Sequence, residues 1–436
     1  MHNYWIVPDD TFCKRFLRYL TWGFFAVFLF RTGNAQEPSS PPISPLHETA
    51  QELQAIETGE MDDDVPAPAI ELLPVFKHEI RDLFASLLQR APDADATTLQ
   101  KQVVTALSAA GVTLGDRLKG HEVYNEHDAV QHFVLTHPYG AIGDIVVRAP
   151  PGHNDLLVFT ADLEISCGSD SVLYVFQKAN GNWRRILDVE SNGYKEVSGG
   201  LGMFDSKFGG GTAAGGWFLV TTDVNPWCSS NWQSLRWKVV RPGPGPEKPE
   251  VLMTASDGVY LGVDEPYRLS ANEAGFELRF YSDELLDLGE LVRPHVRNYS
   301  LVGRAFNRIA PVAFRPDHFV DEWSRMDERE AKEWTSPTVG SQTWKWHKLL
   351  RSPKRPRFGT SFSFVQPCPG GSHWQVGLAF EAYEGERLAA GVPQQLVFTV
   401  SKHKEGFLLS GVTSTRPPGC PGETAPPPQP PGLPPQ

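Results

Sequence analysis

The chain has 436 residues, with 52 acidic against 40 basic side chains and a formal charge of −12. An acidic protein repels nucleic acid and anionic lipid at long range, so neither is expected as a partner. Trp is frequent, at 12 residues, and the 37 prolines and 39 glycines concentrate in linkers and turns, as in a folded protein with many strands.

Residues 1–35 have the three regions of a cleavable secretory signal peptide. A basic region at Lys14 to Arg18 precedes twelve almost entirely apolar residues, Tyr19–Phe30, and Gly33-Asn34-Ala35 supplies small residues at a cleavage point. Twelve apolar residues fall short of the roughly 20 that a membrane-spanning helix needs, and no later segment is longer. We expect a secreted or periplasmic protein without a transmembrane segment. Cleavage would remove four basic and two acidic residues and leave a formal charge of −14.

The N-terminal part of the remaining chain is expected to be a linker followed by helices. Residues 36–70 are predicted to be disordered, because Pro and acidic residues dominate them. Apolar residues recur at helical spacing from Glu71 to Ala91, and a second helix is expected from Thr97 to Ala110. These two helices predict a helical hairpin within residues 71–119.

From residue 120 the apolar period changes to two, which predicts antiparallel β-strands. A β domain is expected at residues 120–335, ending in an amphipathic helix at Asp317–Trp334. A basic segment and further strands follow at residues 336–415, and residues 416–436 are predicted to be a Pro-rich disordered tail. The strands expected with the clearest pattern are Asp155–Leu163, Val172–Gln177, Trp217–Thr222, Ser234–Arg241, His373–Tyr383, Gln394–Ser401 and Phe407–Thr413.

The β domain contains an internal repeat. Residues 157–162 read LVFTAD and residues 218–223 read FLVTTD, and Thr160, Asp162 and Cys167 each recur 61 residues later as the same residue type. A third copy is expected to start at Gly275. Repeated units of about four strands predict a mainly antiparallel, β-propeller-like or stacked-sheet fold, with a β-sandwich as the alternative.

No catalytic signature is present in the sequence. It lacks GxSxG, HExxH, Walker A and a GxGxxG motif between a strand and a helix. No catalytic residue can therefore be assigned, and no cofactor is strongly implied.

Four cysteines remain after the predicted cleavage. Cys167 and Cys228 occupy equivalent positions in neighbouring repeat units, whereas Cys368 and Cys420 bracket the C-terminal strands. An even count in an oxidising compartment favours disulfides, and we predict pairing within each set among the three connectivities that four cysteines allow.

One short segment has the composition of a metal site. Its imidazoles and carboxylates suit zinc, copper or nickel. The alternative is a set of polar residues on loops and strand edges. The candidate metal ligands are His121, Glu122, His127, Asp128 and His132, with His137 nearby.

Two further segments are candidate ligand-binding sites. Trp227, Asn231 and Trp232 combine indole rings with an amide, as needed to stack on and hydrogen-bond a sugar, although Trp also fills gaps between sheets. A basic stretch without acidic residues could hold an anionic polymer, the alternative being a solvated linker or a patch that neutralises the acidic surface. Its candidate residues are Trp344, Lys345, Trp346, Lys348 and Arg351.

These observations favour an exported binding or interaction protein whose partner is an envelope glycan or an anionic polymer. The alternative is a secreted hydrolase that acts on polysaccharide, whose paired carboxylates a single sequence cannot pick out. His318, Asp321 and Glu322 share one face of the expected late helix, which we interpret as a solvated face.

Overall fold

The computed structural model describes residues 43–58, 65–115, 120–125, 130–135, 137–191, 194, 200–210, 216–226, 230–286, 292–351, 359–382, 387–418 and 420. The predicted signal peptide, most of the predicted Pro-rich tail, and the candidate residues Trp227, Cys228, His127 and Asp128 lie outside these residues. The described strands form four sheets of four or five strands and one two-stranded hairpin.

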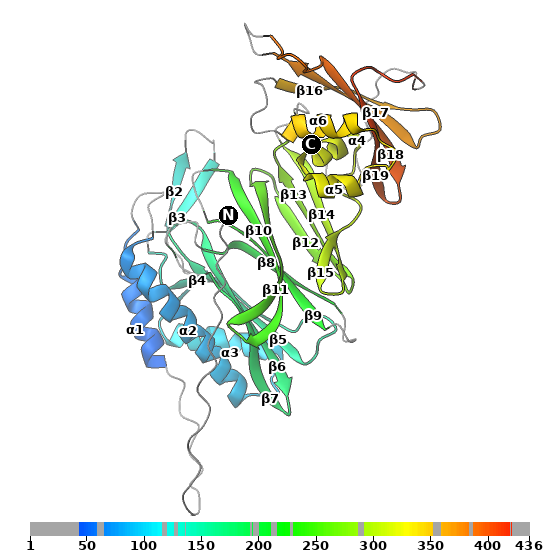
Figure 1. Cartoon of the computed structure of the whole chain (residues 1–436). Coiled ribbons are helices and arrows are strands. Elements are labelled where there is room, and N and C mark those ends of the chain that lie inside the picture. Colours follow the sequence, from blue (N-terminus) through cyan, green and yellow to red (C-terminus); the bar gives the residue numbers. More distant parts are fainter. Residues whose placement is uncertain are drawn as a thin grey trace, which may run out of the picture. The chain divides into compact units, whose positions relative to one another are not determined.

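Each of the four larger sheets is built on four antiparallel strands that follow one another in chain order (Figure 1). This up-and-down order is that of a propeller blade, and the predicted mainly antiparallel, propeller-like stacking of sheets is confirmed. The first sheet contains β4 (Ala141–Arg148), β5 (Leu156–Glu164), β6 (Ser169–Ala179) and β7 (Asn182–Val189), with β1 (Thr113–Leu114) parallel to β4. The second contains β8 (Gly202–Gly210), β9 (Trp217–Val224), β10 (Trp232–Gly245) and β11 (Lys248–Tyr260). The third contains β12 (Tyr267–Ala271), β13 (Gly275–Ser282), β14 (Arg293–Val302) and β15 (Ala305–Arg308), and the fourth contains β16 (Gly359–Pro367), β17 (His373–Glu381), β18 (Gln395–His403) and β19 (Gly406–Thr413).

The repeat of 61 residues corresponds to one sheet. Asp162 lies on β5 and Asp223 lies on β9, and each of these is the second strand of its sheet. The third copy begins at Gly275, where β13 starts as the second strand of the third sheet. Each unit therefore starts one strand earlier than the sequence suggests, because the first strands share no recognisable pattern. The C-terminal strands form a fourth unit of the same topology, which the sequence did not reveal.

Three helices precede the first sheet, namely α1 (Ile43–Gln54), α2 (Ala67–Arg90) and α3 (Ala96–Ala109). Asp95 caps α3, since its side chain accepts a hydrogen bond from the backbone N–H of Thr98 at 2.7 Å. The prediction of disorder for residues 36–70 is wrong where α1 lies. Leu46, Ala50 and Leu53 form a buried stripe at helical spacing, which the surrounding Pro and acidic residues concealed.

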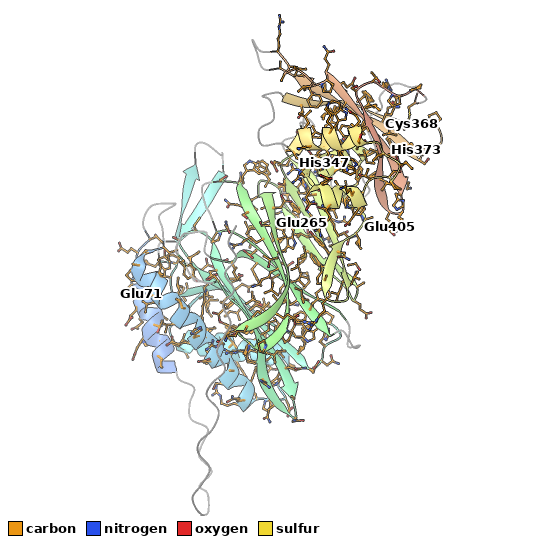
Figure 2. All side chains as sticks on the ribbon, in the orientation of Figure 1. Glu71, Glu265, His347, Cys368, His373 and Glu405 are labelled. Carbon is orange, nitrogen blue, oxygen red and sulfur yellow. A yellow bond between two sulfur atoms is a disulfide. The ribbon has the colours of Figure 1, made fainter. Side chains whose placement is uncertain are left out.

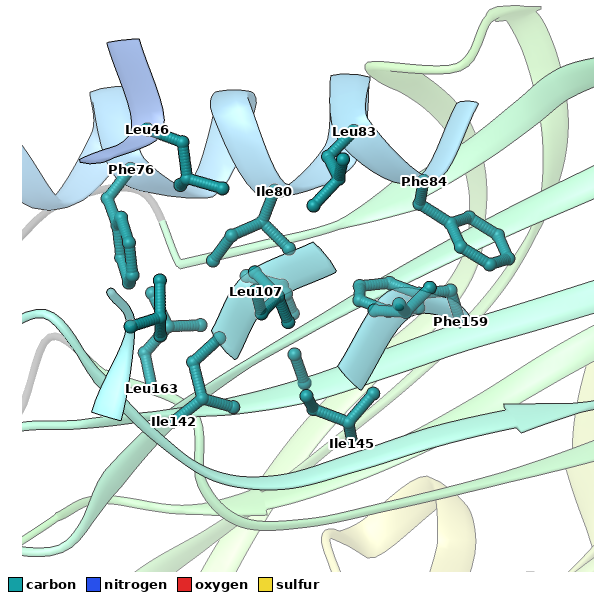
Figure 3. Packing of buried hydrophobic residues seen from close by; sticks show 14 of the residues in the cluster. Leu46, Phe76, Ile80, Leu83, Phe84, Leu107, Ile142, Ile145, Phe159 and Leu163 are labelled. Carbon is teal, nitrogen blue, oxygen red and sulfur yellow. The ribbon is translucent and has the colours of Figure 1, made fainter. Parts of the chain in front are cut away.

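Helix α2 packs on the first sheet through apolar side chains. Figure 3 shows Ile80 and Phe84 of α2 pointing toward Leu107 of α3 and Phe159 of β5. The rings of Phe84 and Phe159 stack with their centroids 4.6 Å apart. Burial of this apolar surface, at about 25 cal/mol per Å², is the dominant favourable contribution to the interface.

The helical region before the fourth sheet differs from the sequence prediction. The single helix expected at Asp317–Trp334 is two helices, α4 (Pro316–Arg325) and α5 (Glu328–Glu333), because Asp327 caps a new helix by accepting a hydrogen bond from Glu330 N–H at 2.8 Å. The amphipathic character that the sequence predicts is present, with Phe319 and Trp323 buried. The basic stretch forms a third helix, α6 (Ser341–Arg351), instead of a linker.

One disulfide is formed between described residues. Cys368 and Cys420 are bonded to each other, which confirms the predicted C-terminal pair. Cys167 is also disulfide-bonded, but its predicted partner Cys228 lies outside the described residues, so that pairing stays a prediction. Within the described part of the chain, no helix is long and apolar enough to cross a membrane.

Candidate functional site

A cavity of about 620 Å³ lies where the second sheet, the third sheet and the helices α4–α6 meet. This volume is in the range of small-molecule binding sites. Figure 2 draws its side chains as sticks, and the label of His347 marks α6, which contributes two residues to the lining. The lining residues are Trp237, Ala255, Ser256, Asp257, Leu285, Arg297, Tyr299, Arg308, Glu322, Ser324, Arg325, Met326, Glu330, Leu350 and Arg351.

The carboxylate of Glu322 is the centre of the ion network that frames this cavity. It accepts hydrogen bonds from Arg293 at 3.0 Å, from Arg297 at 2.8 Å and from Arg308 at 3.0 Å. His295 Nδ1 lies 2.6 Å from the same carboxylate. Arg293, His295 and Arg297 alternate along β14 and therefore point to one face of the third sheet, toward α4.

Glu322 is held as a permanent anion. Burial alone would raise the pKa of this carboxyl, but Arg297 and Arg293, followed by His295, outweigh burial and hold its pKa well below the ordinary value. Glu322 therefore carries its charge at any physiological pH and cannot donate a proton in a reaction.

The other charged groups at the cavity are paired except for one. Arg297 donates to Asp257 at 2.5 Å, Arg308 donates to Glu330 at 2.7 Å, and Arg325 donates to Asp321 at 3.2 Å. Arg351, the last residue of α6, makes no salt bridge or hydrogen bond with any described residue and is exposed. Arg325 has its partners, Asp321 and Asp283, outside the lining, so the arginines and carboxylates of the network balance one another.

Two buried donor atoms of the lining residues lack a hydrogen-bond partner among the described residues. They are Nε1 of Trp237 and Nε of Arg308. Buried N–H groups are rarely left unpaired, because the loss of water is not compensated. Both atoms have almost no accessible surface, so they lie in packed surroundings behind the cavity wall and are not open to a ligand.

The residues of the basic stretch divide between the core, the surface and the cavity. Trp346 is only 5% exposed and packs in the core formed by α4–α6 and the fourth sheet, so its indole is not a surface for stacking. Trp344 is half-buried, with its ring centroid 6.2 Å from that of Trp323. Lys345 and Lys348 are exposed. Of the predicted residues in this stretch, Arg351 is the one that lines the cavity.

The aromatic loop lies elsewhere. Trp232, at the start of β10, is 40% exposed, and its ring centroid is 4.9 Å from that of Tyr260. The backbone carbonyl of Asn231 accepts a hydrogen bond from Leu261 N–H at 2.7 Å. Neither residue lines the cavity, and a sugar site at this loop stays a prediction.

The histidine cluster is described only in its backbone. His121 and Glu122 lie on β2 (Gly120–Asn125) and His132 lies on β3 (Val130–Leu135), with Val123 opposite His132 in the hairpin. The described residues contain no group of three or more His, Cys, Asp or Glu arranged to hold a metal ion. A metal site at this hairpin stays a prediction, because the side chains concerned are not among those described.

The sequence interpretation missed the ion network. His318, Asp321 and Glu322 were expected on a solvated helix face, and this is wrong, since all three are at most 2% exposed. The available signal was the alternation of Arg293, His295 and Arg297 in a strand, followed by an Asp-Glu pair in a helix. Alternating basic residues on one strand face need acidic partners when that face is buried.

No protein-family model matches the chain, and no curated protein sequence matches it. Similar solved structures include the GH93 alpha-L-arabinofuranosidase of Fusarium graminearum with arabinobiose, at 11% identity and a TM-score of 0.23, over 58% of this chain and 61% of that chain. A mutant alpha-L-arabinofuranosidase from the same organism, in complex with an iminosugar inhibitor, is 10% identical with a TM-score of 0.23, over 58% of this chain and 59% of that chain. The chain spans less than two thirds of the length of these enzymes.

Proposed function

We propose that the protein is exported and binds a saccharide-sized polar ligand in the arginine-lined cavity. The cavity itself carries this proposal, because its volume is about 620 Å³ and its lining combines the aromatic rings of Trp237 and Tyr299 with charged groups. A sugar has apolar C–H faces that pack on aromatic rings and hydroxyl groups that hydrogen-bond to charged side chains. An envelope or extracellular glycan is the partner that fits an exported protein.

Export is supported by two features. Residues 1–35 have the composition and order of a signal peptide. The disulfide between Cys368 and Cys420 is of a kind that persists in oxidising compartments.

Binding is favoured over hydrolysis in this cavity by the state of its central carboxylate. A glycosidase needs a carboxylic acid that donates a proton to the leaving oxygen. Glu322 stays ionised and already accepts hydrogen bonds from three arginines, so it cannot fill that role.

The proposal is tested by saturation-transfer NMR of the full chain with neutral and acidic oligosaccharides of two to four sugar units. We expect binding that is weakened in Trp237→Phe, which reduces the aromatic surface in the cavity lining. Trp183→Phe is the matched control, because Trp183 donates to Pro92 O at 2.9 Å and does not line the cavity. Absence of binding by all of these sugars, or equal binding by both variants, would contradict the proposal.

A hydrolase that acts on polysaccharide is the second candidate, and Glu164 favours it. Glu164 and Asp162 are two residues apart on β5 and so point to the same face of the first sheet. Burial, followed by the charge of Asp162, raises the pKa of Glu164 to about 7, so this carboxyl holds a proton near neutral pH as a general acid must. The test is release of reducing sugar from polysaccharide, abolished in Glu164→Gln and retained in Glu381→Gln. A native protein that releases no reducing sugar removes this candidate.

A further inference from the structure

We propose that the ligand of the cavity is an uncharged saccharide, whose hydroxyl groups are recognised by Tyr299, Glu330 and Arg351. This inference rests on the proposed function, because it names the class of ligand for the same cavity. It is carried by the polar atoms of these three residues, which lack a hydrogen-bond partner among the described residues and differ in whether they donate or accept.

The hydroxyl of Tyr299 is a polar group of the cavity lining. Tyr299 and Arg297 are two residues apart on β14 and so point to the same face of the third sheet. The ring of Tyr299 stacks on that of Phe276, with the centroids 4.9 Å apart, which fixes its direction. Its hydroxyl makes no hydrogen bond with any described residue and, unlike Nε1 of Trp237, keeps accessible surface. Because burial raises the pKa of Tyr299, the hydroxyl keeps its proton and can both donate to a ligand and accept from it.

Two helices bring polar groups of opposite kinds to the same lining. Glu330 of α5 accepts a hydrogen bond from Arg308 at 2.7 Å through Oε1, whereas its Oε2 makes no hydrogen bond with a described residue. Arg351 is the last residue of α6, and its guanidinium group is without a salt bridge or hydrogen bond in the described part of the chain. The lining thus presents an acceptor on Glu330, a donor on Arg351 and a group of either kind on Tyr299.

A ligand satisfies these three groups when it both donates and accepts hydrogen bonds. Each hydroxyl of a sugar does both, and two hydroxyls on adjacent carbons can donate to Glu330 and accept from Arg351. A carboxylate or sulfate group accepts only, so it would leave Oε2 of Glu330 unpaired and bring a second negative charge beside it. An ammonium group donates only, so it would leave Arg351 unpaired and bring a second positive charge near it.

The charge of the ion network agrees with an uncharged ligand. Arg297, Arg308 and Arg325 of the lining are each paired with carboxylates. A balanced network exerts little long-range attraction on either an anion or a cation. The affinity then comes from direct hydrogen bonds and from packing on the aromatic rings of the lining, so it should not depend on salt.

The experiment is isothermal titration calorimetry of the full chain with four trisaccharides at low and high salt. Three probes are neutral, namely cellotriose, galactotriose and maltotriose, and the fourth is trigalacturonate, the acidic counterpart of galactotriose. The variants are Tyr299→Phe and Glu330→Gln. Their matched controls are Tyr281→Phe, at a half-buried tyrosine of β13, and Glu333→Gln, at an exposed glutamate of α5, neither of which lines the cavity.

We expect at least one neutral probe to bind more tightly than trigalacturonate, with an affinity that is the same at low and high salt. Tyr299→Phe should weaken this binding about three- to tenfold, the loss expected for one hydrogen bond, and Glu330→Gln should weaken it about tenfold or more, because its acceptor is charged. Tyr281→Phe and Glu333→Gln should leave it unchanged. Thermal unfolding of Tyr299→Phe should match that of the native chain, because the lost hydroxyl bonds no described residue.

The possible failures are distinguishable. Trigalacturonate that binds as tightly as the best neutral probe, or an affinity for that neutral probe that falls with salt, overturns the inference but leaves saccharide binding intact. Equal binding of the best neutral probe by Tyr299→Phe and Tyr281→Phe shows that the hydroxyl of Tyr299 does not recognise the ligand, which also overturns the inference. Absence of binding by all four probes overturns both the inference and the proposed function.

Discussion

Two helices of this protein pack against a β-sheet in opposite ways. Helix α2 faces the first sheet with apolar side chains such as Phe84, which stacks on Phe159. Helix α4 faces the third sheet with the carboxylates of Asp321 and Glu322, which meet the guanidinium group of Arg293, and all three side chains are fully buried.

Stability alone can explain one of these two interfaces but not the other. Apolar burial stabilises in proportion to area, whereas a buried ion pair gains little over a well-packed apolar pair, because desolvation of the charges offsets their attraction. The apolar burial at the α2 interface is therefore explained by its contribution to stability alone. We infer that the interface of α4 is retained because it fixes the charges of the cavity beside it.

The comparison is tested most strongly by removing one member of each interface. Glu322→Gln should lower the free energy of unfolding by about 3–5 kcal/mol, because Arg293 and Arg297 remain buried beside a neutral partner. Phe84→Ala should cost a similar amount, about 3–5 kcal/mol, through the cavity that it leaves.

The pH dependence then separates the two variants in urea denaturation. The pKa of Glu322 is lowered in the folded protein, so its contribution is present above the ordinary carboxyl pKa and is lost as pH falls below it. The deficit of Glu322→Gln should therefore shrink in acid, and that of Phe84→Ala should not. Equal deficits at pH 3 and pH 7 for both variants would show that the charge of Glu322 is not what stabilises its interface.

A smaller effect is expected from His318 in α4. Burial lowers the pKa of His318 to about 3, below the ordinary value of 6.5, so the unfolded chain binds a proton between these values that the folded chain does not. Stability should fall as pH drops from 6.5 toward 3. His318→Gln should flatten this slope, so that about 3 kcal/mol of the stability lost by pH 4.5 is regained, as measured by thermal unfolding with the exposed His403→Gln as control. An unchanged slope between pH 6.5 and 4.5 would count against a neutral, buried His318.

In the first sheet, the carboxyl of Glu164 is expected to change the stability with pH in the opposite direction to His318. The pKa of Glu164 is raised to about 7, so the folded chain holds a proton between pH 4.5 and 7 that the unfolded chain releases, and stability falls as pH rises through this range. Glu164→Gln should stabilise the protein by about 3 kcal/mol at pH 8 and by little at pH 4. The exposed Glu405→Gln should do neither. Stabilisation that is the same at both pH values would refute the raised pKa.

Much of the fold could be predicted from sequence, since alternation of apolar residues locates strands such as β5 and β9, and the equivalence of Thr160 with Thr221 locates the repeat. The spacing of Cys368 and Cys420 around the C-terminal strands was enough to predict their bond. Helix α1 was missed because its short apolar stripe lies in a segment whose composition resembles a linker.

The cavity could not be predicted. Its charged residues come from elements that are far apart in sequence, namely β11, β14, β15, α4, α5 and α6. Local sequence patterns do not show which of the 52 acidic side chains pairs with which of the 40 basic ones. The basic stretch did contain Arg351, but periodicity failed to show that Trp346, two residues after Trp344, turns into the core. The packing of α4 on the third sheet brings these residues together, and this tertiary contact cannot be read from local sequence patterns.

The central claim, that the cavity binds a saccharide, is tested most directly at the indole signal of Trp237, which lies in the cavity lining. A ¹H–¹⁵N correlation spectrum resolves indole signals of the chain's 12 tryptophans, and the signal missing in Trp237→Phe identifies Trp237. On titration with neutral and acidic oligosaccharides of two to four sugar units, the Trp237 signal should move as ligand fills the cavity beside the ring, while that of Trp183 stays in place. A Trp237 signal that stays fixed at the highest concentration of each of these sugars, or shifts confined to Trp232, would contradict the claim.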